Sequence, residues 1–577
     1  MTSVNARDLP AETRRDFLLL ATSFAASAAG LAHAGQAGQA GLAPPAAASD
    51  AEAITAATLR EAEKLLSIRF TDAEREQMLR TIPERERMMR LLARELPNDL
   101  APASVFSPQL PGLDVPRVTT TGRPSTLPDA APPLPDRDED IAFAPLMHLA
   151  SWVRDRRITS ARLTDIYLQR IARHAPTLLC CITVTADLAR KQAAEADAEI
   201  TAGRWRGPLH GIPYGLKDII DTAGIPTTWG AEPWKDRVPT EDAWVTRRLR
   251  EAGAVLVAKT AVGALAYGDI WHGGTCKSPW NVDKGSSGSS AGSASGVASA
   301  LYGFAIGSET LGSIVSPSDR CGCASLRPTF GRVARTGVMS LVWSMDKVGA
   351  LCRSIADTGL VLDAINGRDV DDPSSRDEPF TWSHDQDARG LVLGYDPKWC
   401  RDNPYADTAA AAVEAARRAG CEVIEIGLPR IDPTPALITL YAEAAAAFDQ
   451  LTRTNADDQL RWQVDEAWPN TFRQAHFLSA IDLINGDRVR RRLCRGMFDL
   501  FDQLQAVLAP PFAGGLLALT NLTGQPCAVV RAGFDSAGEP QAVTIMGRIF
   551  DEGTVLRVAS AIERELGVST RRPTATP

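Results

Sequence analysis

Two serine-bearing turns lie close together in the chain and offer its most evident chemistry. Residues 285–296 read GSSGSSAGSASG, and residues 307–314 read GSETLGSI. A serine hydroxyl becomes a nucleophile when a neighbouring base takes its proton, and glycine lets the backbone approach a ligand closely. A flexible Gly/Ser linker has a similar composition, but Trp280-Asn281 and the apolar residues 297–306 flank this one. The two turns therefore predict a site for serine chemistry.

One interpretation makes Ser290 the nucleophile. Residues 288–292 match the GxSxG elbow of α/β-hydrolases, in which the serine follows an apolar strand on a sharp turn. The preceding residues 278–284, SPWNVDK, are polar and rich in turn formers. The elbow therefore remains a weaker alternative.

The order of motifs around these turns resembles the amidase signature family. Residues 288–332 contain a GSSAGS run, a GSxTxGSI turn and a CGxxxLRPTFGR segment. Upstream, residues 207–218 read GPLHGIPYGLKD, which is similar to the lysine-bearing element of that family, and residues 521–526, NLTGQP, resemble its C-terminal element. The resemblance covers residues 141–570, about three quarters of the chain.

This resemblance implies a Ser-Ser-Lys triad. By position, Ser313 corresponds to the nucleophile, Ser289 to a relay serine in a cis peptide, and Lys217 to the base. The resemblance also implies that an oxyanion hole is formed by the backbone N–H groups of Thr310, Leu311, Gly312 and Ser313.

The chemistry requires a neutral lysine. Burial or nearby positive charge lowers the pKa of a lysine and so makes it a base. Lys217 lies between Leu216 and the apolar Ile219-Ile220, which favours burial over a surface position. Ser289 can relay a proton because one hydroxyl both donates and accepts.

Three positions depart from the pattern of the family. Leu311 stands where glycine is common, and we expect it to narrow the pocket. Val315 replaces a common arginine, and Glu309 replaces a common aspartate. These changes leave the triad positions intact but put the hydrogen bonds that support the turn in question.

The sequence predicts no metal and no cofactor. Its ten cysteines contain no CxxC pair, and its seven histidines form no HExxH motif, whereas a zinc site needs about four suitably spaced ligands. The net charge of -8 argues against a nucleic-acid partner. We interpret the basic run at residues 488–495 as the solvated face of a helix.

The N-terminus resembles a twin-arginine export signal over residues 1–34. Arg14-Arg15 precede an apolar run, and Ala32-His33-Ala34 offers a cleavage site. The apolar run is too short for a confident membrane span, so we expect no stable membrane insertion. We expect a periplasmic or extracellular protein, cleaved near Ala34, in which some cysteines could pair as disulfides.

The remaining chain predicts an α/β protein. Residues 35–50 read as a flexible linker and residues 51–138 as a helical extension with a proline-rich connector. Alternating helical and strand patterns then favour an α/β domain over residues 139–570, followed by a tail at 571–577. We expect helices at 145–155, 160–174 and 186–201, strands at 180–185, 254–258, 391–394 and 421–426, a helix capped by Asp407 and a last helix at 552–566. The resemblance implies a central mixed β-sheet surrounded by helices.

The predicted function is hydrolysis of a small carboxamide or an aryl or alkyl amide through an acyl-enzyme. Hydrolysis of esters or carbamates is an alternative, because the acyl-enzyme chemistry is shared. A glutamine-cleaving subunit of a tRNA amidotransferase is a further alternative, against which the export signal argues. A non-catalytic binding protein and a homodimer stay open. Candidate pocket walls are Trp271, Trp280, Leu311 and Phe512, although such residue types belong more often to the core than to a pocket.

Overall fold

The computed structural model describes residues 54–83, 96–113, 127–401, 403–427 and 431–573. The predicted signal at 1–34 and linker at 35–50 lie outside these residues. A hairpin of two helices, α2 (Ala56–Leu66) and α3 (Asp72–Leu79), begins the described chain. Arg75 joins the two helices through a buried ion pair with Glu63, with Nε 2.6 Å from Oε1.

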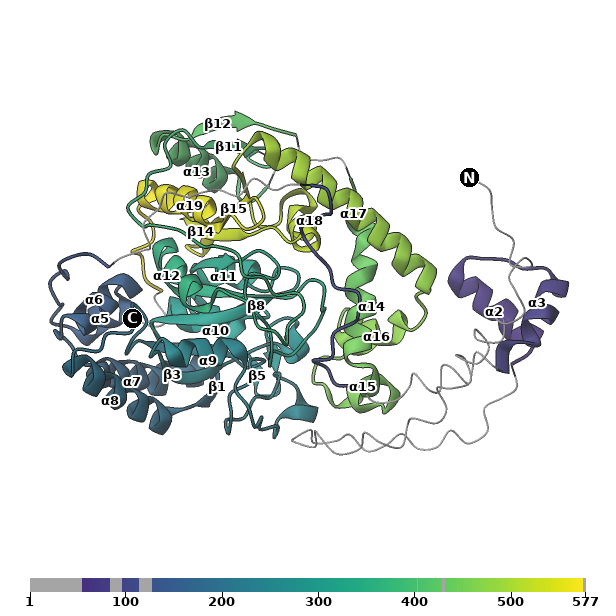
Figure 1. Ribbon diagram of the computed structural model, residues 1–577, viewed down its shortest axis with the longest axis horizontal. Coiled ribbons are helices and arrows are strands. Elements are labelled where there is room, and N and C mark those ends of the chain that lie inside the picture. Colours follow the sequence, from purple (N-terminus) through teal and green to yellow (C-terminus); the bar gives the residue numbers. More distant parts are fainter. Residues whose placement is uncertain (1–53, 84–95, 114–126, 402, 428–430, 574–577) are drawn as a thin grey trace, which may run out of the picture. The chain divides into compact units, whose positions relative to one another are not determined.

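An 11-stranded sheet organises the main domain (Figure 1). The strands, in their order across the sheet, are β1 (Cys181–Val184), β3 (Val255–Thr260), β2 (Pro213–Lys217), β8 (Phe304–Glu309), β10 (Lys347–Cys352), β9 (Ala324–Arg327), β14 (Cys527–Phe534), β15 (Pro540–Gly547), β13 (Ala506–Ala509), β11 (Val392–Tyr395) and β12 (Glu422–Glu425). The sheet is mixed, as predicted: two groups of three strands are parallel, β3, β2 and β8 in one half and β13, β11 and β12 at one end. The other neighbouring strands, including β1 at the opposite end, pair antiparallel.

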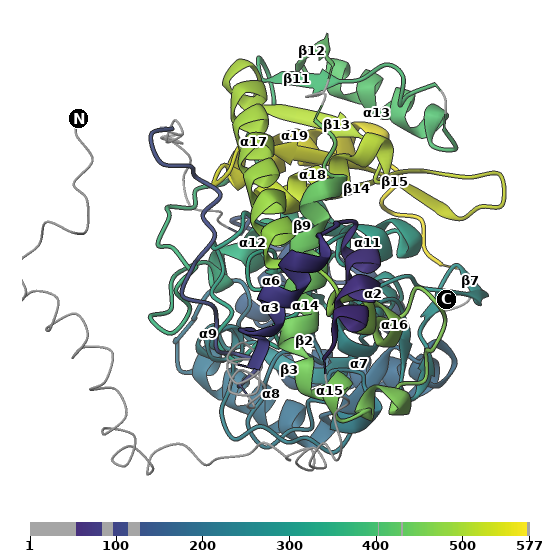
Figure 2. The same cartoon turned by 90° about the vertical axis from the view of Figure 1, so that its right-hand side faces the viewer.

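Helices surround this sheet (Figure 2). They are α5 (Asp138–Phe143), α6 (Leu146–Arg154), α7 (Ser160–Leu178), α8 (Ala186–Thr201), α9 (Trp244–Glu251), α10 (Ala291–Ala298), α11 (Val315–Cys321), α12 (Ile355–Ile365), α13 (Ala406–Arg418), α14 (Ile438–Ala447), α15 (Asp449–Arg453), α16 (Trp468–Ala475), α17 (Ala480–Gln503), α18 (Leu516–Thr523) and α19 (Glu552–Leu566). Two small hairpins, β4 (Ile270–Trp271) with β5 (Gly274–Thr275) and β6 (Lys277–Ser278) with β7 (Asn281–Gly285), precede α10. Among the described residues, no helix is long and apolar enough to cross a membrane.

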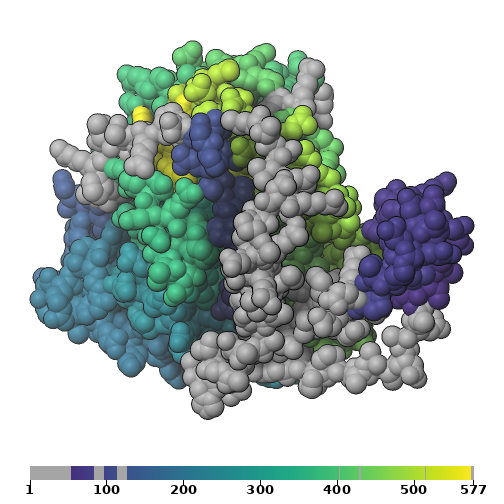
Figure 3. Space-filling view, turned by 45° about the vertical axis from the view of Figure 1, so that its right-hand side comes forward, coloured from purple at the N-terminus to yellow at the C-terminus, as the bar shows by residue number. Residues whose placement is uncertain are grey.

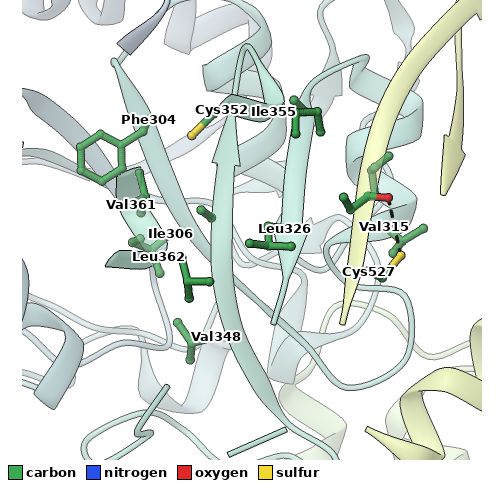
Figure 4. Packing of buried hydrophobic residues seen from close by; sticks show 14 of the residues in the cluster. Phe304, Ile306, Val315, Leu326, Val348, Cys352, Ile355, Val361, Leu362 and Cys527 are labelled. Atoms are coloured by element: carbon green, nitrogen blue, oxygen red, sulfur yellow. Dashed lines mark hydrogen bonds between the residues drawn. The ribbon is translucent and has the colours of Figure 1, made fainter. Parts of the chain in front are cut away.

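The core lies between the sheet and the helices that pack on it. Figure 4 shows Phe304 and Ile306 of β8 and Val348 of β10 beside Val361 and Leu362 of α12. These five side chains are at most 1% exposed. Burial of apolar surface stabilises a fold by about 25 cal/mol per Å². This packing therefore holds β8 in place, and β8 carries side chains of the site.

Several local predictions need correction. Asp407 does not cap α13, because Tyr405 holds the cap position and Asp407 lies in the first turn. Helix α7 continues beyond the predicted residue 174 to Leu178, with Pro176 inside it. The basic run on α17 is not a fully solvated face: Arg490 is 2% exposed and its Nε donates to the carbonyl of Leu522 at 2.6 Å.

The connector before the main domain contacts it directly. Asn98 donates through Nδ2 to the carbonyl of Ser340 at 2.9 Å and accepts from the Ser340 N–H at 2.8 Å. Phe106 lies edge-on to Phe330, with ring centroids 5.3 Å apart, and beneath the guanidinium of Arg490. Part of this connector is visible in dark blue in Figure 3. The structure therefore gives the proline-rich segment a packing role.

Candidate active site

Lys217 ends β2 and is fully buried, as its apolar neighbours predicted. Its Nζ lies 2.8 Å from Ser289 Oγ, 3.1 Å from Ser290 Oγ and 2.9 Å from Ser308 Oγ. Strand β8 is parallel to β2 and ends with Ser308 and Glu309. The carboxyl ends of parallel neighbours meet at one edge of a sheet, and this brings the lysine and the serines together.

Burial shifts the proton affinity of this lysine. Removal from water disfavours the ammonium form and lowers the pKa of Lys217 to about 7. The carboxylates of Asp346 and Glu309 oppose that shift only partly. A large fraction of Lys217 is consequently neutral near pH 7 and able to accept a proton.

The peptide bond between Gly288 and Ser289 is cis, as the resemblance implied. Ser289 is 1% exposed, and its hydroxyl contacts the lysine. Ser290 is fully buried, and its hydroxyl accepts from the N–H of Ser308 at 3.1 Å and donates to the Ser308 carbonyl at 3.0 Å. These contacts make Ser290 a support for β8 and disfavour the elbow interpretation.

Gly288 has no room for a side chain. A Cβ at this position would lie 1.8 Å from the carbonyl oxygen of Gly268. We expect Gly288→Ala to displace the Ser289 hydroxyl, to lower the melting temperature and to reduce turnover at least a hundredfold. The added methyl group would clash with backbone, which cannot move aside as a flexible side chain can. Gly427→Ala is the control, since its Cβ would meet no atom within 4 Å. Equal activity and melting temperature in the two variants would contradict this assignment.

Ser313 lies in the turn between β8 and α11 and is 9% exposed. Its carbonyl accepts from the N–H of Ser290 at 3.1 Å, which ties the two serine turns together. Within the described residues, no hydrogen bond joins the Ser289 and Ser313 hydroxyls. Gly312 has a φ of +89°, a left-handed conformation that favours glycine.

The turn also presents unused donors. In the described part of the chain, the N–H groups of all four predicted residues, Thr310, Leu311, Gly312 and Ser313, are seen to donate to no protein acceptor. Consecutive free N–H groups at one turn form a concave anion site. The Thr310 side chain points elsewhere and donates to Asp346. The geometry is therefore suited to an oxyanion at the predicted position.

Glu309 holds this turn from behind. Its Oε2 accepts from the N–H groups of Ile314 at 2.8 Å and Val315 at 2.9 Å. Its Oε1 accepts from Arg327 at 2.6 Å and from Asn521 at 2.8 Å. Burial alone would raise the pKa of Glu309, but the nearby cations outweigh it and lower the pKa to about 2. The glutamate therefore remains ionised and provides the support that its departure from aspartate had put in question.

The two other departures have simple structural outcomes. Val315 is fully buried in α11, where the arginine common in the family is absent. Leu311 is half-buried and packs against the core, and Leu517 of α18 lies over Gly312, 3.1 Å from a Cβ built there. Apolar side chains thus flank the oxyanion turn.

Sequence reasoning did not identify the supporting residues Ser308, Asp346 and Lys347. Ser308 and Glu309 are consecutive on β8, so their side chains point to opposite faces, one toward the lysine and one toward Arg327. Recognition of a strand ending at Glu309 would have revealed this division. A small cavity beside the lysine is lined by Ile219, Ala266, Ser308, Thr310, Met339, Asp346 and Lys347, among others.

The three aromatic residues predicted as pocket walls differ in their exposure and contacts. Trp271 is 8% exposed and donates through Nε1 to the Leu179 carbonyl, away from the site. Trp280 donates to the Cys321 carbonyl and packs on Phe534. Phe512, 53% exposed, lies just before α18. Within the described residues, none of these three forms a hydrogen bond or ring contact with Lys217, Ser289 or Ser313.

The cysteines are unpaired in the structure, and described histidines such as His210 have other contacts. All ten cysteines are free thiols, so the structure has none of the disulfides that export would allow. Within the described residues, no group of three or more His, Cys, Asp or Glu side chains could hold a metal ion. His210 instead accepts from the N–H of Arg206 through Nδ1 at 3.1 Å.

Comparison with known proteins identifies the family of this chain. The family model described as Amidase matches residues 162–514, and the chain belongs to this amidase signature family. A glutamyl-tRNA(Gln) amidotransferase subunit from Roseiflexus sp. is 33% identical over 473 residues, which cover 72% of this chain and 95% of that protein. The corresponding subunit from Geobacter metallireducens is 31% identical over 469 residues, which cover 73% of this chain and 96% of that protein.

Solved structures extend the comparison to the fold. Native peptide amidase from Stenotrophomonas maltophilia superposes with a TM-score of 0.66 at 30% identity and covers 74% of this chain and 98% of that one. An amidase family protein from Bacillus anthracis, at 23% identity and a TM-score of 0.68, shares the fold. These likenesses support carbon–nitrogen bond hydrolysis as the general activity of the chain.

Proposed function

We propose that this protein hydrolyses the amide bond of a small carboxamide or an aryl or alkyl amide through Ser313, Ser289 and Lys217. The observation that carries the proposal is the contact of the buried Lys217 Nζ with Ser289 Oγ at 2.8 Å, combined with a pKa of about 7 for that lysine. A base with a pKa near the working pH transfers protons efficiently in both directions.

The first half of the reaction forms the acyl-enzyme. Ser313 Oγ attacks the carbonyl carbon while its proton passes to Ser289 and the Ser289 proton passes to neutral Lys217. The oxyanion accepts hydrogen bonds from N–H groups of the turn at residues 310–313, and loss of one such donor costs about 3 kcal/mol of transition-state stabilisation. The C–N bond then breaks, and the lysine returns its proton through Ser289 to the departing amine.

The second half reverses these proton movements. Water loses a proton through Ser289 to Lys217 as its oxygen attacks the acyl carbon. Collapse of the second tetrahedral intermediate breaks the bond to Ser313 Oγ, which regains a proton. The products are a carboxylic acid and an amine or ammonia, and all atoms of the amide and one water are accounted for.

A substrate panel with covalent labelling tests this function. We expect the purified protein to release amine or ammonia from amides and a fluorophosphonate probe to modify Ser313, located by peptide mass spectrometry. A Ser313→Ala protein measures the background. Ester and carbamate substrates of matched acyl groups show whether the leaving group matters. Labelling of Ser290, or no turnover of any amide, would refute the proposal.

A glutaminase activity is the second candidate. The 33% identity to an amidotransferase subunit over 95% of that protein favours it. Release of glutamate from free glutamine, faster than from peptide or aryl amides, would establish it instead.

Export stays part of the proposal. A twin-arginine signal at Arg14-Arg15 would direct the folded enzyme out of the cytoplasm, with cleavage near Ala34. The enzyme we propose works outside the cytoplasm on a small molecule, alone or as a homodimer.

A further inference from the structure

An aromatic cluster flanks the site and has no role in the chemistry proposed so far. Ring centroids of consecutive members lie 4.9–6.3 Å apart, within the range of favourable aromatic pairs. Four separate segments supply the rings: Trp229 and Trp234, Tyr267, Phe448, and Trp462, Trp468 and Phe472.

Both ends of this cluster connect to the triad. The N–H of Trp229 donates to the carbonyl of Asp218 at 3.0 Å, one residue after Lys217. At the other end, the Gly268 carbonyl touches Gly288 so closely that a Cβ there would lie 1.8 Å from it. The indole of Trp462 covers Gly268, because a Cβ on Gly268 would lie 3.1 Å from its Cζ3. Only one glycine therefore separates the Trp462 ring from the Gly288–Ser289 peptide.

The rings differ in exposure along the cluster. Phe448, Trp468 and Phe472 are at most 7% exposed and serve the core. Tyr267 and Trp462 are half-buried, with their ring centroids 5.0 Å apart at an angle of 32°. The Nε1 of Trp468 donates to the Leu265 carbonyl at 3.0 Å and fixes the loop that carries Tyr267. A partly exposed aromatic pair is thus linked through Gly268 to the peptide that carries Ser289.

We propose that Tyr267 and Trp462 bind an aromatic ring of the substrate close to the scissile amide. This inference rests on the proposed function and names its substrate class as aromatic amides. Half-buried aromatic faces gain most from a flat apolar partner that excludes water from them. The side chains of Leu311 and Leu517, which lie by Gly312 at the oxyanion turn, add apolar surface on the nucleophile side. A charged, flexible substrate such as glutamine would find little to recognise in these four side chains.

Matched pairs of amides test the inference with the full-length protein. Phenylacetamide and cyclohexylacetamide place the ring on the acyl side, and N-benzylacetamide and N-(cyclohexylmethyl)acetamide place it on the amine side. Each pair has a methylene between ring and amide, so carbonyl reactivity is similar. We expect kcat/KM to favour the aromatic member of at least one pair about tenfold, the equivalent of about 1.4 kcal/mol.

Variants separate stacking from general packing. Tyr267→Leu and Trp462→Leu should bring the ratio of kcat/KM for the aromatic and saturated members close to one. Tyr267→Phe and Trp462→Phe, which keep a ring and the packing, should keep the preference. Trp205→Leu, at a half-buried tryptophan packed on His210, is the matched control and should keep it as well.

The failure of this inference is distinct from failure of the proposed function. Hydrolysis of both members without aromatic preference, or a preference unchanged in both leucine variants, overturns the aromatic site alone. If no amide is cleaved, the proposed function fails. Binding of the same amides to Ser313→Ala, measured by quenching of tryptophan fluorescence, then tests the aromatic site by itself. Tighter binding of the aromatic member, lost in Trp462→Leu, supports the site, and equal binding overturns it.

Discussion

Replacing Lys217 by methionine should lower kcat/KM for any amide about 10,000-fold, the upper end of what a positioned general base contributes. Methionine has a similar length and no basic nitrogen, so the fully buried site remains filled. The three hydroxyls of Ser289, Ser290 and Ser308 would lose their common partner. We expect the fold to survive, because a buried amine pays a desolvation cost that a thioether avoids.

The pH dependence of the unmodified enzyme reports the same residue. The active form has neutral Lys217, whose pKa is about 7. As the pH falls below 6, kcat/KM should fall about tenfold per unit because the lysine becomes protonated, and it should level off above pH 8. Lys217→Met should show no such limb in its residual rate.

An exposed lysine provides the control. Lys235 lies in a surface loop, and Lys235→Met should leave the rate and its pH profile unchanged. If Lys217→Met kept a tenth of the activity, or if the profile were flat between pH 5 and 8, Lys217 would not be the base.

Replacing Glu309 by glutamine should cost about 3–5 kcal/mol of unfolding free energy, because it removes one partner of a fully buried ion pair. Glu309 and Arg327 are 0% exposed, with Nη1 2.6 Å from Oε1. Lys347 lies nearby, and burial lowers its pKa well below the usual range. Without the carboxylate, the buried guanidinium of Arg327 loses the counter-ion that it contacts directly.

The same variant should also slow the reaction about a hundredfold. One carboxylate oxygen accepts from both Ile314 and Val315, directly after the nucleophile. A glutamine amide offers only one oxygen, so either these N–H groups or Arg327 would face an NH₂ group and lose an acceptor. The turn would shift, and its free N–H groups would no longer meet the oxyanion.

Urea denaturation and initial rates measure the two effects. Glu414→Gln is the matched control, since Glu414 forms an exposed pair with Arg417 on α13, and such pairs contribute about 0–1 kcal/mol. Equal loss of stability in the two variants, or a normal rate in Glu309→Gln, would show that the glutamate does not hold the turn.

Local pattern predicted much of the secondary structure. The last helix was predicted at its observed bounds, and the strand at 421–426 contains β12. The boundaries that differed depend on tertiary contacts. Arg490 is one of five arginines in the basic run at residues 488–495, which was predicted to be solvated. The Leu522 carbonyl and the Phe106 ring cover it, and a helical repeat in the sequence cannot show such contacts.

The sequence by itself determined the family, and it predicted three triad positions and a buried lysine, because motif spacing and apolar neighbours are local properties. Only the tertiary structure decided what surrounds them. Ser308 and Asp346 lie 91 and 129 residues beyond Lys217 and reach its neighbourhood through strand pairing. Glu309 gained its role from Arg327 and Asn521, and Trp462 reached Gly268 across almost 200 residues. Such contacts follow from the way that sheet and helices bury apolar surface together, which no single segment of the chain encodes.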